Sequence, residues 1–366
     1  MVDKVRIAIV GLGVMGRDHL KNARAQMDLL QVVGVNDVAP AAATAAEAAS
    51  VPFFSELDAL LHQSPDALIV STPHPLHEEV VLAAAERRIP VLCEKPIAAT
   101  ASAADRMVAA CHRNGVILAM DFQMRASPVY QAVHRLLNDG TVGELSRVAV
   151  VATNWFRTQA YYDSGSWRGT WEGEGGGVLM NQAAHDLDLY CWLAGVPQRV
   201  KATVHTRVHR IETENTVAAL LEHEAGRVDT FVTTTAEYPG RTEWTFAGDR
   251  GTLVCDGKSL RLFQLDHSLT QHILADRHGQ RPAGEWKDVS IDPVPPADTG
   301  HVGLLRQFAR AVRDRVPPLA TGEDGVRALD LANAMILSGF RDRPVEVPVN
   351  RAMYDQLLHE LRQREV

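Results

Sequence analysis

Apolar and polar positions follow two different rhythms along this chain. Up to about residue 124, short apolar runs rich in Val, Ile and Leu alternate with Ala-rich stretches of helical spacing. This pattern predicts strands at 5–11, 30–37, 67–73, 90–96 and 116–122, and helices at 18–27, 41–50, 76–87 and 101–114. Strands and helices that alternate in this way are typical of an α/β fold with a doubly wound parallel sheet. Such sheets bind ligands beyond the carboxyl ends of their strands.

The rhythm changes after residue 124. One more helix is predicted at 129–138, and longer alternating segments follow at 145–156, 215–238 and 242–257. The last two contain glycine turns that suit antiparallel hairpins. We therefore predict two domains, residues 1–124 and residues 125–366, the second an α+β domain with a large open, mainly antiparallel sheet. A Pro-rich loop is expected at 290–300, with helices at 301–312 and 323–340.

Bulk composition narrows the function classes. The chain has 366 residues, which is too long for one ordinary core, and its net charge of −8 gives no basic surface for nucleic acid. No apolar stretch reaches the roughly 18 residues of a membrane span, and the N-terminus runs into the first strand without a signal-peptide pattern. We expect a cytoplasmic protein. Its four cysteines lie far apart without a CxxC pair, which indicates thiols and not a zinc or disulfide framework.

The stretch GLGVMG, residues 11–16, directly follows the first predicted strand and opens a helix. In a dinucleotide-binding turn, Gly11 allows the tight bend, Gly13 lets the backbone approach a pyrophosphate, and Gly16 lets helix and strand pack closely. The helix that begins at Val14 and Met15 offers its N–H groups and positive dipole end to the phosphates. The sequence therefore predicts a dinucleotide site.

Asp37 closes the second predicted strand, about 20 residues beyond the glycines, where an acid binds the adenosine ribose. A carboxylate at this point hydrogen-bonds the 2′-hydroxyl and repels a 2′-phosphate. The next residues, Val38, Ala39 and Pro40, include no Arg or Lys that would accept the phosphate. The pattern favours NAD over NADP.

The stretch VLCEKP, residues 91–96, brings a charged pair to the end of a buried strand, where Pro96 interrupts it. If that end faces the cofactor crevice, Lys95 can orient a substrate hydroxyl and transfer protons once burial lowers its pKa. Glu94 can then lie beside the cofactor ribose. We regard Lys95 as a candidate catalytic residue.

A second constellation lies in residues 165–195. The triple glycine 175–177 allows close backbone approach and precedes an expected amphipathic helix. On that helix Asn181, His185 and Asp188 would share one face. An Asn suits a substrate hydroxyl, and a His suits a proton acceptor because its pKa is near neutrality.

Residues 154–171 supply three Trp, two Tyr and two Arg. Aromatic faces suit the CH-rich faces of a sugar ring, and arginines can hold an acidic group. The predicted substrate contacts are Asn154, Trp155, Arg157, Trp171, Arg125 and Asn181. The pair His74 and His77 has no complementary ligand cluster in the sequence, so no metal is expected there.

The motifs GLGVMG, STPHPLHEE, CEKP and GGG…NxxxHxxD, in this order, resemble the Gfo/Idh/MocA oxidoreductases. The resemblance extends over essentially the whole chain, including residues 321–338 and 344–349. It implies a Rossmann domain followed by an open-sheet α+β domain, homo-oligomers assembled through the sheets, either dimers or tetramers, and metal-free chemistry. It also implies that Lys95 lies at the substrate and that His185 is the catalytic histidine.

The same resemblance implies a set of cofactor contacts. The residues implied to line the nicotinamide side are Ser71, Thr72, His77, Glu94 and Gln123, and Trp167 and Arg168 would reach the cofactor from the second domain. Many members carry Asp four residues before the histidine, where this chain has Asn181. An amide accepts no proton, so the proton has to move through His185 or Lys95.

Three functions compete at this stage. The first is an NAD-dependent dehydrogenase of a sugar, cyclitol or glycoside. The second is a glycoside hydrolase that uses NAD transiently, through oxidation, elimination, water addition and re-reduction. The third, a non-catalytic dinucleotide sensor, is disfavoured because Lys95 and His185 are intact. The expected partner is a small carbohydrate-like substrate, with neither nucleic acid nor membrane.

Overall fold

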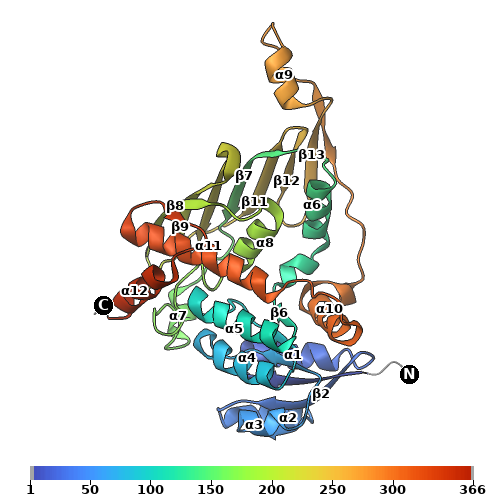
Figure 1. Cartoon of the computed structure of the whole chain (residues 1–366), viewed down its shortest axis with the longest axis vertical. Coiled ribbons are helices and arrows are strands. Elements are labelled where there is room, and N and C mark those ends of the chain that lie inside the picture. The colour runs from blue at the N-terminus through green and yellow to red at the C-terminus, as the bar shows by residue number, and fades with distance from the viewer. Residues whose placement is uncertain (1–3, 364–366) are drawn as a thin grey trace. The chain divides into compact units, whose positions relative to one another are not determined.

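The computed structural model describes residues 4–363 and divides into two compact units (Figure 1). The first unit comprises the chain up to Ala126 together with Gly173–Gly175 and Val294–Leu329. The second comprises Ser127–Glu172, Gly176–Pro293 and the chain from Asp330 onward. The units thus divide the chain differently from a single boundary after residue 124, because a C-terminal segment returns to the first unit.

The first unit contains a six-stranded sheet in the order β3-β2-β1-β4-β5-β6, and every neighbouring pair is parallel. Its strands are β1 (Val5–Val10), β2 (Leu30–Asn36), β3 (Phe53–Phe54), β4 (Ala67–Val70), β5 (Val91–Cys93) and β6 (Leu118–Met120). The predicted doubly wound sheet is confirmed. The pattern missed β3, because two residues are too few to show a period.

Helices pack on both faces of this sheet. They are α1 (Val14–Arg24), α2 (Ala41–Ala48), α3 (Leu57–Leu61), α4 (His77–Glu86), α5 (Ala101–Asn114) and α10 (Gly300–Asp314), with short 3₁₀ helices η1 (His74–Leu76), η2 (Gln123–Ala126) and η4 (Pro296–Asp298). Ile7 and Ile9 point into one buried cluster with Leu20 of α1 and Phe308 of α10. This buried apolar stripe explains why α10 belongs to the first unit.

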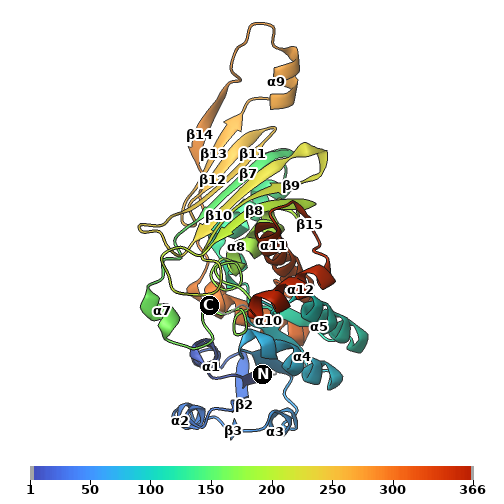
Figure 2. The ribbon, with the colours of Figure 1, turned by 90° about the vertical axis from the view of Figure 1, so that its left-hand side faces the viewer.

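The second unit contains a nine-stranded sheet in the order β14-β13-β12-β11-β7-β10-β9-β8-β15 (Figure 2). Its strands are β7 (Leu145–Ala152), β8 (Arg199–His205), β9 (Thr216–Glu222), β10 (Val228–Thr234), β11 (Thr242–Gly248), β12 (Gly251–Cys255), β13 (Leu260–Leu265), β14 (Gly284–Asp288) and β15 (Val345–Glu346). All neighbouring pairs are antiparallel except β7 and β10. The predicted large, mainly antiparallel sheet is confirmed.

The helices of the second unit are α6 (Pro128–Asn138), α7 (Gln159–Asp163), α8 (Ala184–Ala194), α9 (Leu269–Ala275) and α12 (Arg351–Arg362), with the 3₁₀ helix η3 (Glu224–Gly226); α11 (Gly322–Arg341) has residues in both units. α6 and α8 contact one face of the sheet, at β12 and β7 (Figure 1). Along β9, Val217, Ala219 and Leu221 are buried, whereas Ala218 and Leu220 are exposed. One face of β9 is therefore covered and the other is open.

Two expectations from composition can be compared with the structure. None of the helices in the described part of the chain is long and apolar enough to cross a membrane. All four cysteines are free thiols, and Cys93, Cys111 and Cys255 are buried.

Candidate functional site

The glycine turn between β1 and α1 has three different spatial requirements. Gly11 has a φ of +91°, and a Cβ there would lie 2.5 Å from the Ser71 carbonyl oxygen. A Cβ on Gly16 would lie 1.9 Å from the Gly11 carbonyl oxygen. A Cβ on Gly13 would meet nothing within 4 Å. Packing therefore explains Gly11 and Gly16, whereas no protein atom requires glycine at Gly13, and the space there is what the approach of a pyrophosphate would need.

Asp37 follows β2 and folds back on the same turn. Its carboxylate accepts the Leu12 N–H at 2.6 Å and the Ala39 N–H at 2.8 Å. Arg17 of α1 also reaches this turn, where its Nε donates to the Leu12 carbonyl oxygen at 3.0 Å. As predicted, the residues directly after Asp37 include no basic side chain. α1, however, places the basic side chain of Arg17 near the turn.

His77 joins the loop after β4 to the loop after β5. Its Nε2 lies 2.9 Å from the Thr72 carbonyl oxygen, and its Nδ1 lies 3.1 Å from that of Pro96. Burial lowers the pKa of His77, and hydrogen bonds to these carbonyls only partly oppose the change. These contacts of the fully buried ring hold the two loops together. Its role as a cofactor contact stays a prediction.

Two predicted cofactor contacts carry buried polar atoms that lack a protein partner. Thr72 Oγ1 and Gln123 Oε1 have no hydrogen-bond partner among the residues the structure describes. Buried polar groups are normally hydrogen-bonded, so orphaned atoms at a site call for an explanation. Together with the open position over Gly13, they fit a turn that receives a dinucleotide.

Lys95 follows directly after β5, at the same carboxyl edge of the sheet as Gly11 and Ser71. The Glu94 N–H donates to the Val70 carbonyl oxygen at 2.9 Å, which continues the pairing of β5 with β4 past Cys93. Lys95 is half-buried. The expected position of the Glu–Lys pair at the carboxyl edge of the sheet is confirmed.

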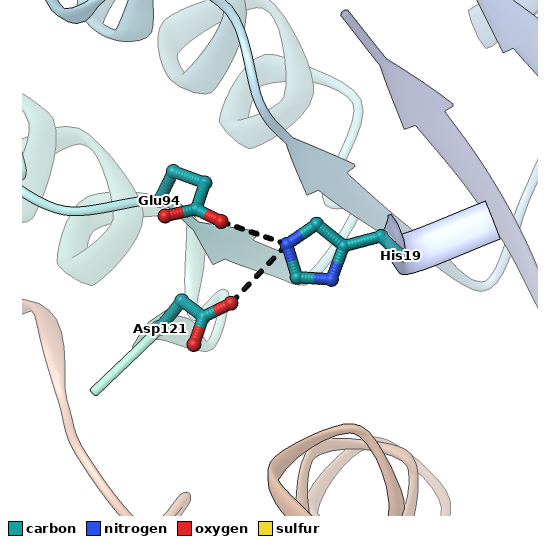
Figure 3. A group of neighbouring side chains, drawn as sticks. All are labelled: His19, Glu94 and Asp121. Atoms are coloured by element: carbon teal, nitrogen blue, oxygen red, sulfur yellow. Dashed lines mark hydrogen bonds and ion pairs between the residues drawn. The ribbon is translucent and has the colours of Figure 1, made fainter. Parts of the chain in front are cut away.

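A buried polar cluster that sequence reasoning missed surrounds Glu94 (Figure 3). His19 Nε2 lies 2.8 Å from Glu94 Oε1 and 3.2 Å from Asp121 Oδ2. His301 Nδ1 lies 3.2 Å from the same Asp121 oxygen. His19 and Asp121 are each 1% exposed and Glu94 is 6% exposed. The signal in the sequence was a histidine on the apolar stripe of α1, between Gly16 and Leu20.

The charge of this cluster follows from its contacts. Burial by itself would lower the pKa of His19, but hydrogen bonds and charges of Asp121 and Glu94 raise it to about 10. Burial opposes ionisation of Asp121 too, yet His19 and His301 hold its pKa well below the usual range. His19 Nδ1 has no partner among residues 4–363, and such a buried N–H costs about 1–3 kcal/mol. Two buried carboxylates left without a cation would cost about 3–5 kcal/mol, so the imidazolium is favoured.

Among the described residues, His19, Glu94 and Asp121 form the one His/Cys/Asp/Glu group whose ligand-type atoms all lie within 4.8 Å of one another. That group does not include the HPLHEE histidines considered in the sequence. Its N···O separations suit hydrogen bonds, and one proton on His19 satisfies both carboxylates. We therefore interpret it as a proton-bound cluster.

Arg125 is buried in the first unit, where its guanidinium donates to Asp324 Oδ2 at 3.0 Å and to the Leu319 carbonyl oxygen at 3.3 Å. These contacts fasten η2 to the first turn of α11 and to the segment just before it. The predicted role of Arg125 in substrate binding stays a prediction, because a buried ion pair already accounts for its position.

The helix that carries His185 begins later than predicted. α8 starts at Ala184, so Asn181 lies in the turn before it and does not share a helix face with His185. The turn holds this shape because the Glu214 carboxylate accepts the N–H groups of Gly177 and Leu179. A Cβ on Gly177 would lie 1.8 Å from the Glu214 carbonyl oxygen. α8 is also buried nearly all round, and not amphipathic as expected.

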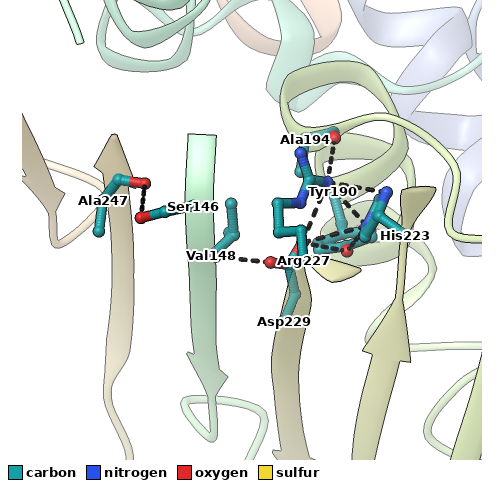
Figure 4. A network of polar contacts seen from close by, with 8 residues as sticks. All are labelled: Ser146, Val148, Tyr190, Ala194, His223, Arg227, Asp229 and Ala247. Atoms are coloured by element: carbon teal, nitrogen blue, oxygen red, sulfur yellow. Dashed lines mark hydrogen bonds and ion pairs between the residues drawn. The ribbon is translucent and has the colours of Figure 1, made fainter. Parts of the chain in front are cut away.

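Within α8, His185 and Asp188 are three residues apart and so share one face, as predicted for this pair. Both are buried, with His185 8% exposed. A buried polar network anchors the other end of the helix (Figure 4). Tyr190 Oη donates to Asp229 Oδ2 at 2.7 Å, and Val148 N–H donates to Asp229 Oδ1 at 2.7 Å. Arg227 donates to the Ala194 carbonyl oxygen at 2.6 Å. These bonds fix α8, and so His185, against β7 and β10.

Tyr161 of α7 is a second feature that sequence reasoning missed. Its hydroxyl accepts Arg168 Nη1 at 2.6 Å and Gln182 Nε2 at 3.2 Å, and Asn181 Nδ2 lies 3.5 Å away. The guanidinium groups of Arg168 and Arg157 lie over its ring, 4.4 Å and 4.9 Å from the centroid. The structure therefore brings Asn181, Arg157 and Arg168 together. Arg168 also lies over Trp167, 4.3 Å from the ring centroid.

The other aromatic positions differ in exposure. Trp155 donates its indole N–H to Asp186 Oδ2 at 2.7 Å, and burial raises the pKa of Asp186 to about 7 against the effect of that hydrogen bond. Trp171 is buried, with its indole N–H on the Glu212 carbonyl oxygen at 3.1 Å. Asn154 is exposed. The predicted substrate contacts thus include exposed, half-buried and core positions.

Comparison with known proteins agrees with this organisation. Residues 5–122 match the oxidoreductase family Gfo/Idh/MocA, NAD-binding Rossmann fold, and residues 130–254 match a Gfo/Idh/MocA C-terminal domain. An inositol 2-dehydrogenase of Saccharopolyspora erythraea is 31% identical, over 96% of this chain and 99% of the relative. A D-apiose dehydrogenase of Paraburkholderia graminis is 28% identical, over 94% and 90%. The WlbA dehydrogenase of Bordetella pertussis, solved with NADH and UDP-GlcNAcA, has a TM-score of 0.80 at 29% identity, over 95% of this chain and 100% of that chain.

The glycine turn gives a matched pair of variants. Gly13 has a φ of −63°, which alanine adopts without strain, and its Cβ would meet no protein atom. We expect Gly13→Ala to keep the melting temperature of the wild type but to weaken NAD binding by about tenfold or more, because the methyl group occupies the approach of the pyrophosphate. Gly16→Ala should instead lower the melting temperature. Calorimetric NAD titration and thermal unfolding check both; unchanged NAD affinity in Gly13→Ala would contradict the assignment.

The raised pKa of His19 predicts that the stability of the folded protein depends on pH. The pKa of His19 rises from 6.5 to about 10 on folding, so its contribution is complete below pH 6.5 and is lost as the pH rises through 10. The free energy of unfolding, measured with urea, should therefore fall between pH 7 and 10. His19→Gln should be about 3–5 kcal/mol less stable at pH 7 and should lose most of this slope. His205 is exposed, so His205→Gln serves as the control and should match the wild type in its free energy of unfolding at each pH. Equal slopes in His19→Gln and the wild type would contradict the assignment.

Proposed function

Since this chain belongs to the Gfo/Idh/MocA family of oxidoreductases, we propose that it oxidises a secondary hydroxyl of a sugar, cyclitol or glycoside with NAD. The observation that carries the proposal is the shared carboxyl edge of one sheet, where the open glycine turn and Lys95 both lie. The relatives named inositol 2-dehydrogenase and D-apiose dehydrogenase support a polyhydroxylated substrate. On this proposal the protein acts in carbohydrate metabolism.

Bound NAD supplies a hydride acceptor beyond the strand ends. The residues proposed to bind it are Gly11, Gly13, Val14, Met15, Gly16, Asp37, Ser71, Thr72, His77, Glu94, Lys95, Gln123, Trp167 and Arg168. The chain itself has to bind the alcohol and accept its hydroxyl proton. In our proposal His185 accepts the hydroxyl proton of the substrate and Lys95 orients the hydroxyl oxygen. His185 lies inside α8 and Lys95 follows the end of β5, so each is held by a rigid element. Asn181 contributes hydrogen bonding only.

Substrate recognition is proposed to involve the surroundings of Tyr161. Arg157 and Arg168 lie on that ring beside Asn181, and neither guanidinium has a carboxylate partner among the described residues. Half-buried arginines without a carboxylate suit a substrate that carries an acidic or strongly polar group. Asn154, Trp155, Trp171 and Arg125 complete the proposed substrate set.

Net oxidation is favoured over redox-assisted glycoside cleavage. The named relatives are dehydrogenases, and a dehydrogenase is also the solved neighbour that carries NADH. A panel of sugars, cyclitols and glycosides, followed both by NADH absorbance and by sugar release, separates the two functions. NADH that accumulates with the oxidised substrate supports the proposal, whereas bond cleavage without net NADH supports the glycosidase.

A homo-oligomer and a cytoplasmic location complete the proposal. The open face of β9 exposes Ala218 and Leu220, and neighbouring β10 exposes Val228, so a second copy could cover apolar surface there. Free, buried cysteines suit a reducing compartment. A dimer and a tetramer are both compatible with these observations.

Turnover should depend on Lys95 and His185. We expect Lys95→Ala and His185→Ala each to lower kcat about 10²–10⁴-fold on the best substrate of the panel, with NAD affinity within a few-fold of the wild type. Exposed Lys21→Ala and His205→Ala are matched controls and should keep wild-type kcat. Near-normal kcat in either site variant would mean that the proton moves through another group.

Asp37 should set the preference for NAD over NADP. Its carboxylate would face the 2′-phosphate, so calorimetry should find NAD the tighter ligand. Asp37→Ala should narrow the difference, because Arg17 remains at the same turn to attract the phosphate. Arg17→Ala in the Asp37→Ala background should then weaken NADP again. Tighter binding of NADP by the wild type would refute the assignment.

A further inference from the structure

We propose that His19 is a positioning residue for the cofactor site, a cation that fixes Glu94 and thereby the start of the Lys95 loop. It acts through Glu94 and touches neither cofactor nor substrate in this proposal. The inference rests on the proposed function, because it assigns a catalytic consequence to a buried cluster of the first unit.

Glu94 is held from two sides. Its Oε1 accepts a hydrogen bond from His19 Nε2 at 2.8 Å, and its Oε2 lies 3.2 Å from the Lys95 backbone N–H. A carboxylate between a buried imidazolium and the backbone of the next residue has little rotational freedom. The rotamer of Glu94 and the direction in which the chain leaves β5 are therefore set together.

His19 also joins the elements that build the site. It lies on α1, the helix that opens at the glycine turn, and its Nε2 also contacts Asp121, the residue after β6. His301 of α10 contacts the far side of Asp121. One ring thus links the cofactor helix to the ends of β5 and β6, at the edge where the nicotinamide is proposed to lie (Figure 3).

The electrostatic role of His19 is clear from the charges that would remain without its ring. Without His19, the carboxylates of Glu94 and Asp121 would face each other in a buried space, and like charges in such a place raise the pKa of one of them. His301 would mainly balance Asp121, because its hydrogen bond is to that residue and it acts on Glu94 only through the longer-range interaction of charges. The pair of carboxylates would then keep a proton up to a higher pH than in the wild type. The other titratable groups beside Glu94 are His77, the Cys93 thiol and Lys95, the next residue. Burial lowers the pKa of His77 and raises that of Cys93, so neither replaces the charge of His19.

The closing experiment compares His19→Gln, Asp121→Asn and the double variant with the wild type. Glutamine keeps an N–H donor but removes the charge. We expect the acid limb of kcat/KM against pH, and of NAD affinity against pH, to move up by about one unit or more in His19→Gln. In the double variant only one carboxylate remains, so the limb should return toward the wild type. His301→Gln should shift the acid limb less than His19→Gln does.

A purely structural role predicts a different result. In that case His19→Gln would lose activity in proportion to its loss of folded protein, with the acid limb unmoved, and Asp121→Asn would add to the loss instead of restoring the limb. Circular dichroism at each pH gives the folded fraction. An unmoved limb in folded His19→Gln would overturn the proposal.

A second measurement needs neither turnover nor cofactor, and so separates this inference from the proposed function. In ¹⁵N-histidine NMR of the wild type, His19 is identified by the signal that His19→Gln lacks, or by its contact with His301 if that variant does not fold. We expect an imidazolium at pH 8. A neutral ring at pH 7 would overturn the proposal. So would a stoichiometric divalent metal in the purified protein that chelators remove together with NAD affinity.

Discussion

The close approach of the β1–α1 turn to the end of β4 constrains the rest of the first unit. A Cβ on Gly11 would lie 2.5 Å from the Ser71 carbonyl oxygen, so the two loops touch backbone to backbone. The contact allows α1 to begin immediately over the carboxyl edge of the sheet, with its N–H groups free for an anion. It also sets the direction of α1, and therefore brings the buried His19 of its second turn to Glu94 at the end of β5.

Each unit contains a buried network of hydrogen-bonded polar side chains, and the two networks perform similar tasks. In the first unit an imidazolium joins a helix to two strand ends. In the second, Tyr190 joins α8 to Asp229 of β10, and the raised pKa that burial gives Tyr190 keeps its hydroxyl a donor. Each network fixes the element that carries one candidate catalytic residue, Lys95 in one unit and His185 in the other. Removing one partner from such a pair leaves a buried charge, which is why these contacts specify orientation strongly.

Much of the fold could be predicted because it depends on local periodicity. The alternating runs gave the parallel sheet, and the glycine spacing gave the turn. The late start of α8 could not be predicted, because it depends on Glu214, more than thirty residues away, accepting the N–H groups of Gly177 and Leu179. The cluster of His19, Glu94, Asp121 and His301 escaped for the same reason: its members are brought together only by the order of the strands and by the return of α10.

The two glycine groups show how one residue type serves different purposes. At Gly11, Gly16 and Gly177 a Cβ would lie 1.8–2.5 Å from a backbone carbonyl oxygen, much closer than van der Waals contact, so packing requires glycine there. Sequence alone cannot distinguish these positions from Gly13, where no protein atom lies within 4 Å of a Cβ. That difference separates packing from function, because a position with free space and ordinary φ has no structural need for glycine. The orphaned oxygens of Thr72 and Gln123 make the same distinction for polar atoms. Both kinds of observation point to a ligand at the carboxyl edge of the sheet, and both come from what the protein leaves unfilled there.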